Sequence, residues 1–464
     1  MKDMTTGKPL RLIISFALPL LLGNLLQQFY NVADAAIVGR FLGADALAAV
    51  GATTSVQFLI LGFCTGTCSG FCIPMAQKFG AKDYSSLRKL FYHSILLVIA
   101  GAFIFTVSCA LLTPQILRIL STPDNIRNDT YAYILVIFLG IPFTLLYNLC
   151  AGVLRAVGDS KTPFMFLAFS TIANIFLDLF CIAVLGWGCA GAAIATIASQ
   201  AACGIGCAWF IYKKFQFLHF SKEERQFRPD LCRTLVVMGF PMGIQFSITA
   251  IGSMFMQSAN NGLGSIYVSA FTVGSRIKMF AMCPIDAIAA AAATFCGQNY
   301  GAGRSDRIRT GYRIGAITGG VYGAFIGAVI IFFGRTSCLL FLKPTDTAIL
   351  NAASQLLRME GYWFWILGLL NVNRITVQGL GFSGRAMVSG AIEMAARTGV
   401  SLFLVPRYGF WAICIADQTA WILADCYIIP MCIHVLRKID RQLGQVNARP
   451  SIRHAKKVSV GATA

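Results

Sequence analysis

The chain has 464 residues, of which 57% are hydrophobic and only 12% are charged, and its formal net charge is +19. A soluble domain carries about 25% charged residues, so this composition excludes an ordinary soluble enzyme or binding domain. It indicates an integral membrane protein.

Long apolar segments fill almost the whole chain. A membrane-spanning helix needs about 20 mostly apolar residues, and twelve segments meet that requirement. We predict an all-α integral membrane protein with twelve transmembrane helices. The expected segments are 12–38, 47–75, 90–113, 131–154, 162–185, 189–212, 235–260, 267–295, 312–336, 357–381, 386–407 and 410–436.

The first segment carries a polar stripe that ends in an acid. Asn24, Gln27, Asn31 and Asp34 are spaced by three or four residues, which places them on one face of a helix. A charged side chain at the centre of a bilayer costs about 2.5–3.5 kcal/mol on insertion scales and usually faces a cavity or a partner. We therefore expect this stripe to face the interior.

The fifth and sixth segments add polar groups at a similar depth. Thr171, Asn174 and Asp178 share one face of the fifth segment, and Thr196 places a hydroxyl in the middle of the sixth. Such groups can serve only to join helices by hydrogen bonds. They can also form a cation site together with Asp34.

The seventh segment has a polar face without an acid. Met256 stands where the repeat places Asp34, and Met282 follows in the eighth segment among methionines and phenylalanines. Flexible thioethers and aromatic faces suit organic cations, although ordinary packing explains them too. The stripe of the seventh segment consists of Gln245, Thr249, Ser253, Gln257 and Asn260.

Further acids lie in the second half of the chain. Asp286 is near enough in sequence to pair with Arg276 or Lys278, and Glu393 shares a helix face with Arg397. We interpret these acids as mainly structural, with a secondary role in coupling as the alternative. The set consists of Asp286, Glu393, Asp417 and Asp425.

The two halves of the chain repeat one another. The run 77–81, Gln-Lys-Phe-Gly-Ala, returns as Gln-Asn-Tyr-Gly-Ala at 298–302, about 221 residues later. Internal repeats of membrane helices are typical of secondary transporters, whose substrate sites lie between the repeats. We predict an N-terminal six-helix lobe (1–212), a linker (213–234), a C-terminal six-helix lobe (235–436) and a basic tail (437–464).

The distribution of basic residues predicts the topology. If the loops alternate between the two sides, the side of the N-terminus collects 27 Lys and Arg and the other side collects 7. The positive-inside rule then places both termini in the cytoplasm. The basic excess thus reports topology in a plasma membrane and not nucleic-acid binding, and residues 437–457 either contact anionic lipids or are simply solvated.

Cysteine and histidine patterns do not indicate a metal site. Most of the 16 cysteines lie inside expected helices, where small side chains permit close packing. The four histidines are scattered, and no spacing fits a zinc site.

Three motifs carry a family resemblance. Residues 38–43 with 46–51, 152–159 and 297–303 together resemble the recurring patterns of the multidrug and toxic compound extrusion (MATE) transporters, over roughly 11–436. The resemblance implies two six-helix lobes around a central cleft. It also implies export of organic, often cationic, compounds in exchange for H⁺ or Na⁺.

The resemblance also assigns roles to residues. In the DinF-like branch of the family, the cation-coupling residues match Asp34, Asn174, Asp178 and Thr196 one by one. The NorM-like branch places acids on helices 7 and 10, where this chain has only Asn371, Asn373 and Arg374 in the middle of helix 10. The implied substrate cleft lies along Asn24, Gln27, Asn31, Gln245, Thr249, Ser253, Gln257, Met256 and Met282.

The residues fit either of two coupling ions. Burial in an apolar cavity disfavours the charged form of a carboxylate, so these acids can take up a proton outside and release it inside. Alternatively, Asp34 and Asp178 can hold Na⁺ with amide and hydroxyl oxygens, since hard cations prefer oxygen ligands. We expect no cofactor besides this ion, and a monomer that is not an enzyme.

Two other functions remain as alternatives. A lipid-linked oligosaccharide flippase of the same superfamily shares the helix plan, but it would favour a cationic cleft, whereas the first lobe offers acids. A membrane-embedded prenyltransferase-type enzyme would need paired Asp-rich metal motifs, and Asn174 with Asp178 is a solitary acid-bearing pair.

Overall fold

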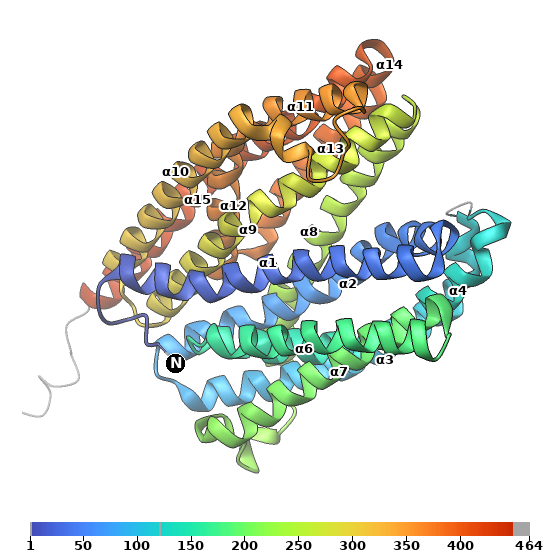
Figure 1. The fold of residues 1–464 in the computed structure, drawn as a ribbon. Coiled ribbons are helices and arrows are strands. Elements are labelled where there is room, and N and C mark those ends of the chain that lie inside the picture. Colours follow the sequence, from blue (N-terminus) through green and yellow to red (C-terminus); the bar gives the residue numbers. More distant parts are fainter. Residues whose placement is uncertain (1, 120–121, 449–464) are drawn as a thin grey trace, which may run out of the picture.

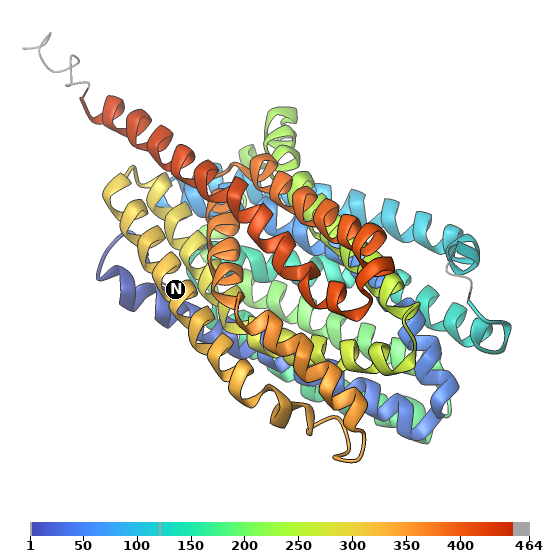
Figure 2. The same ribbon diagram turned by 90° about the horizontal axis from the view of Figure 1, so that it is seen from above.

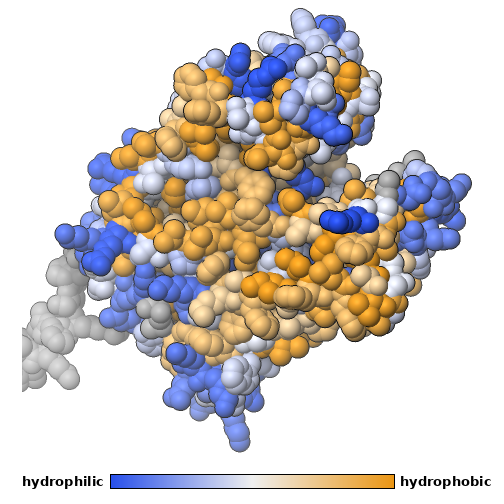
Figure 3. Space-filling view, viewed as in Figure 1, coloured by the Kyte–Doolittle hydropathy of each residue, from blue (hydrophilic) through white to orange (hydrophobic). Residues whose placement is uncertain are grey.

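The computed structural model describes residues 2–119 and 122–448 and is helical throughout, apart from short connections. Ten of its helices are long and apolar enough to cross a membrane, and one bent pair brings the number to eleven within this described part. Hydrophobic residues cover the middle of the face in Figure 3, and hydrophilic residues gather toward the ends. This distribution fits a multi-pass membrane protein.

The first half of the chain forms seven α-helices and one π-helix, shown in blue to green in Figure 1. In chain order these are α1 (Pro9–Leu42), α2 (Ala44–Gly80), α3 (Tyr84–Ile119), α4 (Asp124–Leu139), α5 (Ile141–Ala156), α6 (Lys161–Leu179), the π-helix η1 (Phe180–Val184) and α7 (Gly188–Lys214). Two short 3₁₀ turns, η2 (Gln216–Leu218) and η3 (Glu223–Arg225), lead into the second half.

The second half repeats this order. It comprises α8 (Pro229–Asn261), α9 (Ser265–Gly301), α10 (Ser305–Cys338), α11 (Thr347–Gly361), α12 (Phe364–Gly379), α13 (Ser383–Gly399), the π-helix η4 (Val400–Leu404), α14 (Val405–Tyr408) and α15 (Phe410–Ala448). α2 and α9 both have 37 residues, and a five-residue π-helix follows both α6 and α13. The internal repeat read from the sequence therefore extends to local irregularities of the helices.

The two halves meet along α1, α2, α8 and α9, where α2 packs on α8 and α1 packs on α9. Figure 1 shows the second half above the first, and Figure 3 shows the surface hollowed between them at the end away from the N-terminus. The opposite end, which we call the closed end, holds residues 2–7, 77–80, 156, 298–301 and 379.

A pair of repeat-related hydrogen bonds joins the halves at the closed end. Gln77 Nε2 donates to the carbonyl of Gly379 at 3.2 Å, and its counterpart Gln298 Nε2 donates to the carbonyl of Ala156 at 2.8 Å. Gly80 and Gly301 permit the contact, because a Cβ on either would lie within 2 Å of the carbonyl oxygen of Gln298 or Gln77. The repeated Gln-x-x-Gly motif thus forms this junction.

Several expected boundaries differ from the structure. Segment 131–154 is two helices that bend by 44° at Gly140, because Pro142 in the first turn of α5 cannot continue the hydrogen-bond ladder of α4. Segment 357–381 falls on the end of α11 and on α12, which are separate helices.

The linker and the tail also differ from expectation. The non-helical connector between α7 and α8 is shorter than 213–234, since α7 reaches Lys214 and α8 begins at Pro229. The beginning of the expected tail continues α15 to Ala448, so that this helix projects beyond its neighbours (Figure 2), and residues 449–464 lie outside the described part.

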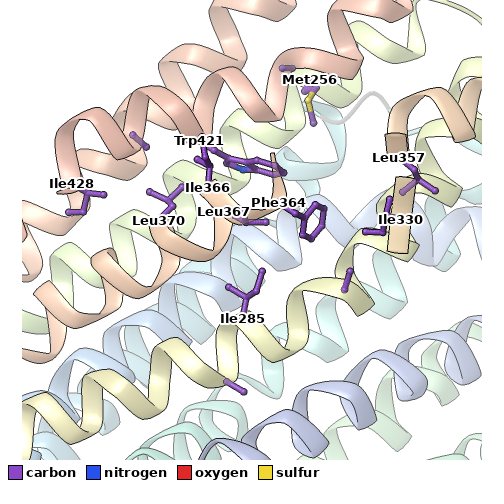
Figure 4. Close-up of a cluster of buried hydrophobic side chains, with 14 of the residues drawn as sticks. Met256, Ile285, Ile330, Leu357, Phe364, Ile366, Leu367, Leu370, Trp421 and Ile428 are labelled. Carbon is purple, nitrogen blue, oxygen red and sulfur yellow. The ribbon is translucent and has the colours of Figure 1, made fainter. Parts of the chain in front are cut away.

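The larger of the two main cores lies in the second half. Figure 4 shows Phe364, Leu367 and Leu370 of α12 packed with Trp421 of α15 and Ile285 of α9. The main core of the first half lies among α2, α3, α5 and α7. Each half thus holds a main core, and the core of the second half also takes in Met4, Ile13, Phe16 and Ala17 from the start of the chain.

Candidate functional site

The four residues expected to bind the coupling cation lie together in the first half. α6 packs between α1 and α7, and it carries Asn174 and Asp178 one turn apart. Asp34 comes from α1 and Thr196 from α7. The π-helix η1 begins two residues after Asp178, and such helices often occur at functional sites because they disturb the regular ladder.

Two acids form the centre of this site. The carboxyl groups of Asp34 and Asp178 are within hydrogen-bonding reach of each other, and Asp178 is 0% exposed. One oxygen of each carboxyl, Oδ1, is buried without a hydrogen-bond partner in the described structure. Two such groups cannot both be ionised so close together unless a cation such as Na⁺ lies between them, and without one they share a proton.

Amide and hydroxyl groups complete the site. With its amide nitrogen turned toward the acid, Asn174 donates to Asp178 Oδ2 at 2.8 Å, while its oxygen accepts from the Thr196 backbone N–H at 3.2 Å. The hydroxyls of Tyr30 and Thr196 lie 3.0 Å apart. Every polar contact of the site therefore comes from an oxygen or an amide.

A cavity of about 290 Å³ lies beside the amide and hydroxyl side of this site, although neither acid belongs to its wall. Asn174 and Thr196 belong to its wall, together with Gln27 and Tyr30 of α1 and Thr171 of α6. Within the described structure, the residues that line this cavity include no lysine or arginine. A cation that enters would meet oxygen atoms and no competing positive charge.

Only some of the residues expected to line the substrate cleft lie along the junction of the two halves. Asn24 donates to the Cys283 carbonyl of the second half at 3.4 Å, Asn31 is half-buried, and Gln27 is exposed to the cavity. Thr249, Ser253 and Gln257 are half-buried or exposed on α8.

Two members of that surface are more buried than expected. Met256 is 3% exposed inside the core of the second half (Figure 4), which corrects its assignment to the cleft: at its position on α8 it faces its own half. Gln245 is buried and accepts a hydrogen bond from Gln378. Met282 packs against the edge of the same core.

The second half contains a buried network of six charged residues. Lys278 binds both Glu360, at 2.8 Å, and Asp417. Arg397 lies 2.7 Å from Asp417 and 3.6 Å from Glu393, and Arg374 binds Glu393 as well. Three cations thus face three anions, so that the network is neutral as a whole, with members from α9, α11, α12, α13 and α15.

The network confirms one expected ion pair and overturns another. Glu393 and Arg397 pair one turn apart as predicted. The expected pairing of Asp286 with Lys278 or Arg276 is wrong: Lys278 lies two turns away along α9, about 12 Å at 1.5 Å per residue, and it binds acids on other helices. Asp286 accepts a hydrogen bond from Asn371 at 3.0 Å instead.

Two residues of these sites were missed in the sequence. Tyr30 lies one turn before Asp34 on the same helix face, and this spacing was a usable signal. Glu360 is 1% exposed and belongs to the network. It lies inside the expected segment 357–381, and no spacing in the sequence indicates its partners.

No metal-binding cluster of three or more His, Cys, Asp or Glu side chains occurs in residues 2–119 and 122–448. All 16 cysteines are free. Many of them pack between helices, as Cys72 does against Gly152.

Comparison with known proteins gives a consistent result. The sequence profile of the MatE family matches residues 19–180 and again residues 241–401. A curated relative from Bacillus subtilis (strain 168), named probable multidrug resistance protein YoeA, is 29% identical over 403 residues, which cover 85% of this chain and 86% of the relative. Probable multidrug resistance protein YpnP of the same organism is 28% identical and covers 89% of both chains.

The fold is that of solved transporters. A structure described as the outward-facing conformation of a multidrug resistance MATE family transporter of the MOP superfamily superposes with a TM-score of 0.88. It covers 95% of this chain and 99% of its own, at 21% sequence identity. The family profile matches twice, at positions about 222 residues apart, in register with the repeated helices.

Proposed function

Because the chain belongs to the MATE family of transporters, we propose that it is a secondary active multidrug efflux antiporter. It exports amphipathic organic cations in exchange for H⁺ or Na⁺ by alternating access. The coupling ion binds at Asp34, Asn174, Asp178 and Thr196. The relatives named as multidrug resistance proteins support the efflux activity.

One observation carries the coupling proposal. The carboxyl groups of Asp34 and Asp178 are within hydrogen-bonding reach of each other, and Asn174 and Thr196 beside them line a cavity that has no basic residue in its described wall. Binding a cation there removes the repulsion between the carboxylates, and releasing it restores that repulsion. The free energy of the site therefore depends on cation occupancy, which is what coupling requires.

The architecture supports alternating access. We propose twelve spans in two six-helix lobes, with α4–α5 and α11–α12 each acting as one broken span. The closed end carries the N-terminus and the end of α15, and the excess of basic residues places it in the cytoplasm. Reporter fusions at Lys222 and Arg127 should then lie on opposite sides, and the same side for both contradicts this topology.

Transport in proteoliposomes tests the function. A pH jump or a Na⁺ jump should drive efflux of a fluorescent organic cation by the wild type and by Asp45→Asn, which changes an exposed acid on α2. Asp34→Asn should abolish gradient-driven efflux while substrate still binds, since an amide keeps the shape of the side chain but exchanges no proton. Efflux by Asp34→Asn at the wild-type rate would refute the coupling site.

The same vesicles separate the proposal from the flippase alternative. A flippase would bind an anionic lipid-linked sugar and leave organic cations untouched. Movement of the sugar lipid without movement of dye cations would replace the antiporter proposal with the flippase.

A further inference from the structure

A carboxyl group in the second half is left over from the buried charge network. Asp425 lies on α15 two turns after Asp417. It is 6% exposed, and both of its carboxyl oxygens are buried without a hydrogen-bond partner in the described structure. α15 packs on α12, which carries Arg374, and on α13, which carries Glu393, and these are the charged side chains whose field reaches Asp425.

Charge balance decides the state of this carboxyl. The network already matches its three cations with three anions. An ionised Asp425 would add an unpaired negative charge to a buried site and would receive no hydrogen bond, at a cost of several kcal/mol. A proton removes that cost, whereas Na⁺ would need several oxygen ligands and would be repelled by Arg374.

The neighbouring groups offer a way to release the proton. Arg374 donates to Glu393 and to Ser389, at 3.0 Å for the latter, and its guanidinium has five N–H donors in a planar fork. If Arg374 turns from Glu393 to Asp425, the proton passes to the acid that loses this partner or leaves the site. Either acid can be the charged one, but not both.

Three further ionisable groups on the helices around Asp425 are engaged elsewhere, and Arg407 and Tyr408 of α14, which also packs on α15, are exposed. Tyr312 of α10 donates to Asn373 of α12 at 2.9 Å. Arg397 of α13 pairs with Asp417 and Glu393, and Glu360 of α11 is held by Lys278. The π-helix η4, which also packs on α15, has no ionisable residue. This leaves Arg374 as the cation that can pair with Asp425, and Glu393 as the acid that can take up its proton.

The site is mechanically linked to the junction of the halves. Glu393 lies on α13, which packs along α8, and α8 is the helix that packs on α2 of the first half. Because α13 also packs on α15, the helix that carries Glu393 lies between the junction helix α8 and the helix that carries Asp425.

We propose that Asp425 is a second proton-binding site, in the half opposite the Asp34–Asp178 site, and that Arg374 controls its occupancy by pairing with either Asp425 or Glu393. This site takes a proton whichever ion the first half uses. Its role in transport rests on the proposed antiport function, but its protonation does not.

Infrared spectroscopy of the purified full-length protein tests protonation directly. A protonated carboxyl has its own C=O stretching band, which shifts in deuterated water. We expect the band of the wild type to lose one component in Asp425→Asn and to stay complete in the control Asp45→Asn. An unchanged band in Asp425→Asn would show that this carboxyl is ionised and would overturn the proposal. This measurement needs no transport, so it does not depend on the antiport function.

The pH profile of efflux tests exchange. Asp425→Asn mimics the permanently protonated state, so it should fold normally and lose part of the wild-type pH dependence. Asp34→Asn should lose gradient-driven efflux altogether. An unchanged pH profile in Asp425→Asn would mean that the proton is held without exchange, and this outcome also overturns the proposal. Absence of efflux in the wild type would instead count against the proposed function.

Discussion

The two halves of this protein share a helix plan but treat buried charge in opposite ways. The first half holds Asp34 within hydrogen-bonding reach of Asp178, and the described wall of the neighbouring cavity has no Lys or Arg. The second half holds a network in which each charged group has an opposite partner. A site left uncompensated must recruit its cation from solution, whereas a compensated site needs none. The same fold thus supports a paired-acid ion site in one half and an internal ion-pair network in the other, where Asp425 is the acid left outside the network.

The repeat shows how the difference arises. The positions of Asp34 and Thr196 are occupied in the second half by Met256 and Gln418. The positions of Asn174 and Asp178 are occupied by Ala396 and Val400. The acids of the second half stand elsewhere on the same helices, where basic residues of neighbouring helices reach them. Placement of acids within the repeat, and not their number, separates the two kinds of site.

Neutralising the acid pair gives the largest expected effect. Asp178→Asn should reduce gradient-driven efflux to background, because one carboxyl alone no longer requires a shared cation. Asp286→Asn should retain most activity, since among the described residues Asp286 bonds only to Asn371. Dye efflux from proteoliposomes after a pH or Na⁺ jump measures both. Collapse in Asp286→Asn with normal efflux in Asp178→Asn would move the coupling site to the second half.

Breaking the buried charge network of the second half should lower the stability of the protein, with a smaller effect on ion coupling. Lys278→Met leaves Glu360 and Asp417 without their shared cation, and removing one partner of a buried ion pair typically costs about 3–5 kcal/mol. Thermal unfolding in detergent should show a clear drop in Tm, with the exposed Lys343→Met as control. Asp34→Asn should not lower Tm, since it relieves repulsion. Equal stability of Lys278→Met and wild type would show that the network is dispensable.

The closed end offers a test of symmetry between the halves. Gly80→Ala and Gly301→Ala should destabilise the closed arrangement by similar amounts, about 1–3 kcal/mol for overpacking, because each Cβ meets a carbonyl oxygen of the other half. Spin labels at exposed positions 82 and 304 should report longer distances in both variants. Gly101→Ala, which has open space around its Cβ, should leave the distances unchanged.

The sequence predicted the local parts of this structure well. The helix faces of Asp34 and of Asn174 with Asp178 follow from residue spacing alone, and the structure brings those faces together. The repeat also gave the correspondence of the helices. Both follow from patterns within one helix or within one alignment of the chain with itself.

Contacts between helices that are far apart in the chain could not be predicted from residue spacing. Lys278, Glu360 and Asp417 come from three helices, and no spacing rule shows that they meet. Sequence proximity suggested the wrong partner for Asp286. Met256 is a residue type that suits a binding surface, but the orientation of α8 about its own axis directs this side chain into the core. The packing of helices that are distant in sequence decides which of several plausible partners a buried charged residue contacts.

The smallest expected effect lies in the linker between the halves. Glu224 accepts hydrogen bonds from Arg88 Nε and Nη2, both at 2.7 Å, and from Ser85 at 2.9 Å. The bond from Arg88 is the main cause that lowers the pKa of Glu224 from its ordinary 4.5 to about 2. Because the folded-state pKa is depressed, the stabilisation is present above pH 4.5. It is lost as the pH falls toward 2.

Glu224→Gln should therefore loosen the linker at neutral pH, which limited proteolysis between α7 and α8 can detect. The exposed neighbour Glu223 provides the matched control Glu223→Gln, whose cleavage rate should equal that of wild type. The global Tm should change little, because Phe215 and Leu218 of the linker stay packed in the core of the first half. Equal cleavage of both variants would show that the Arg88 contact does not hold the linker.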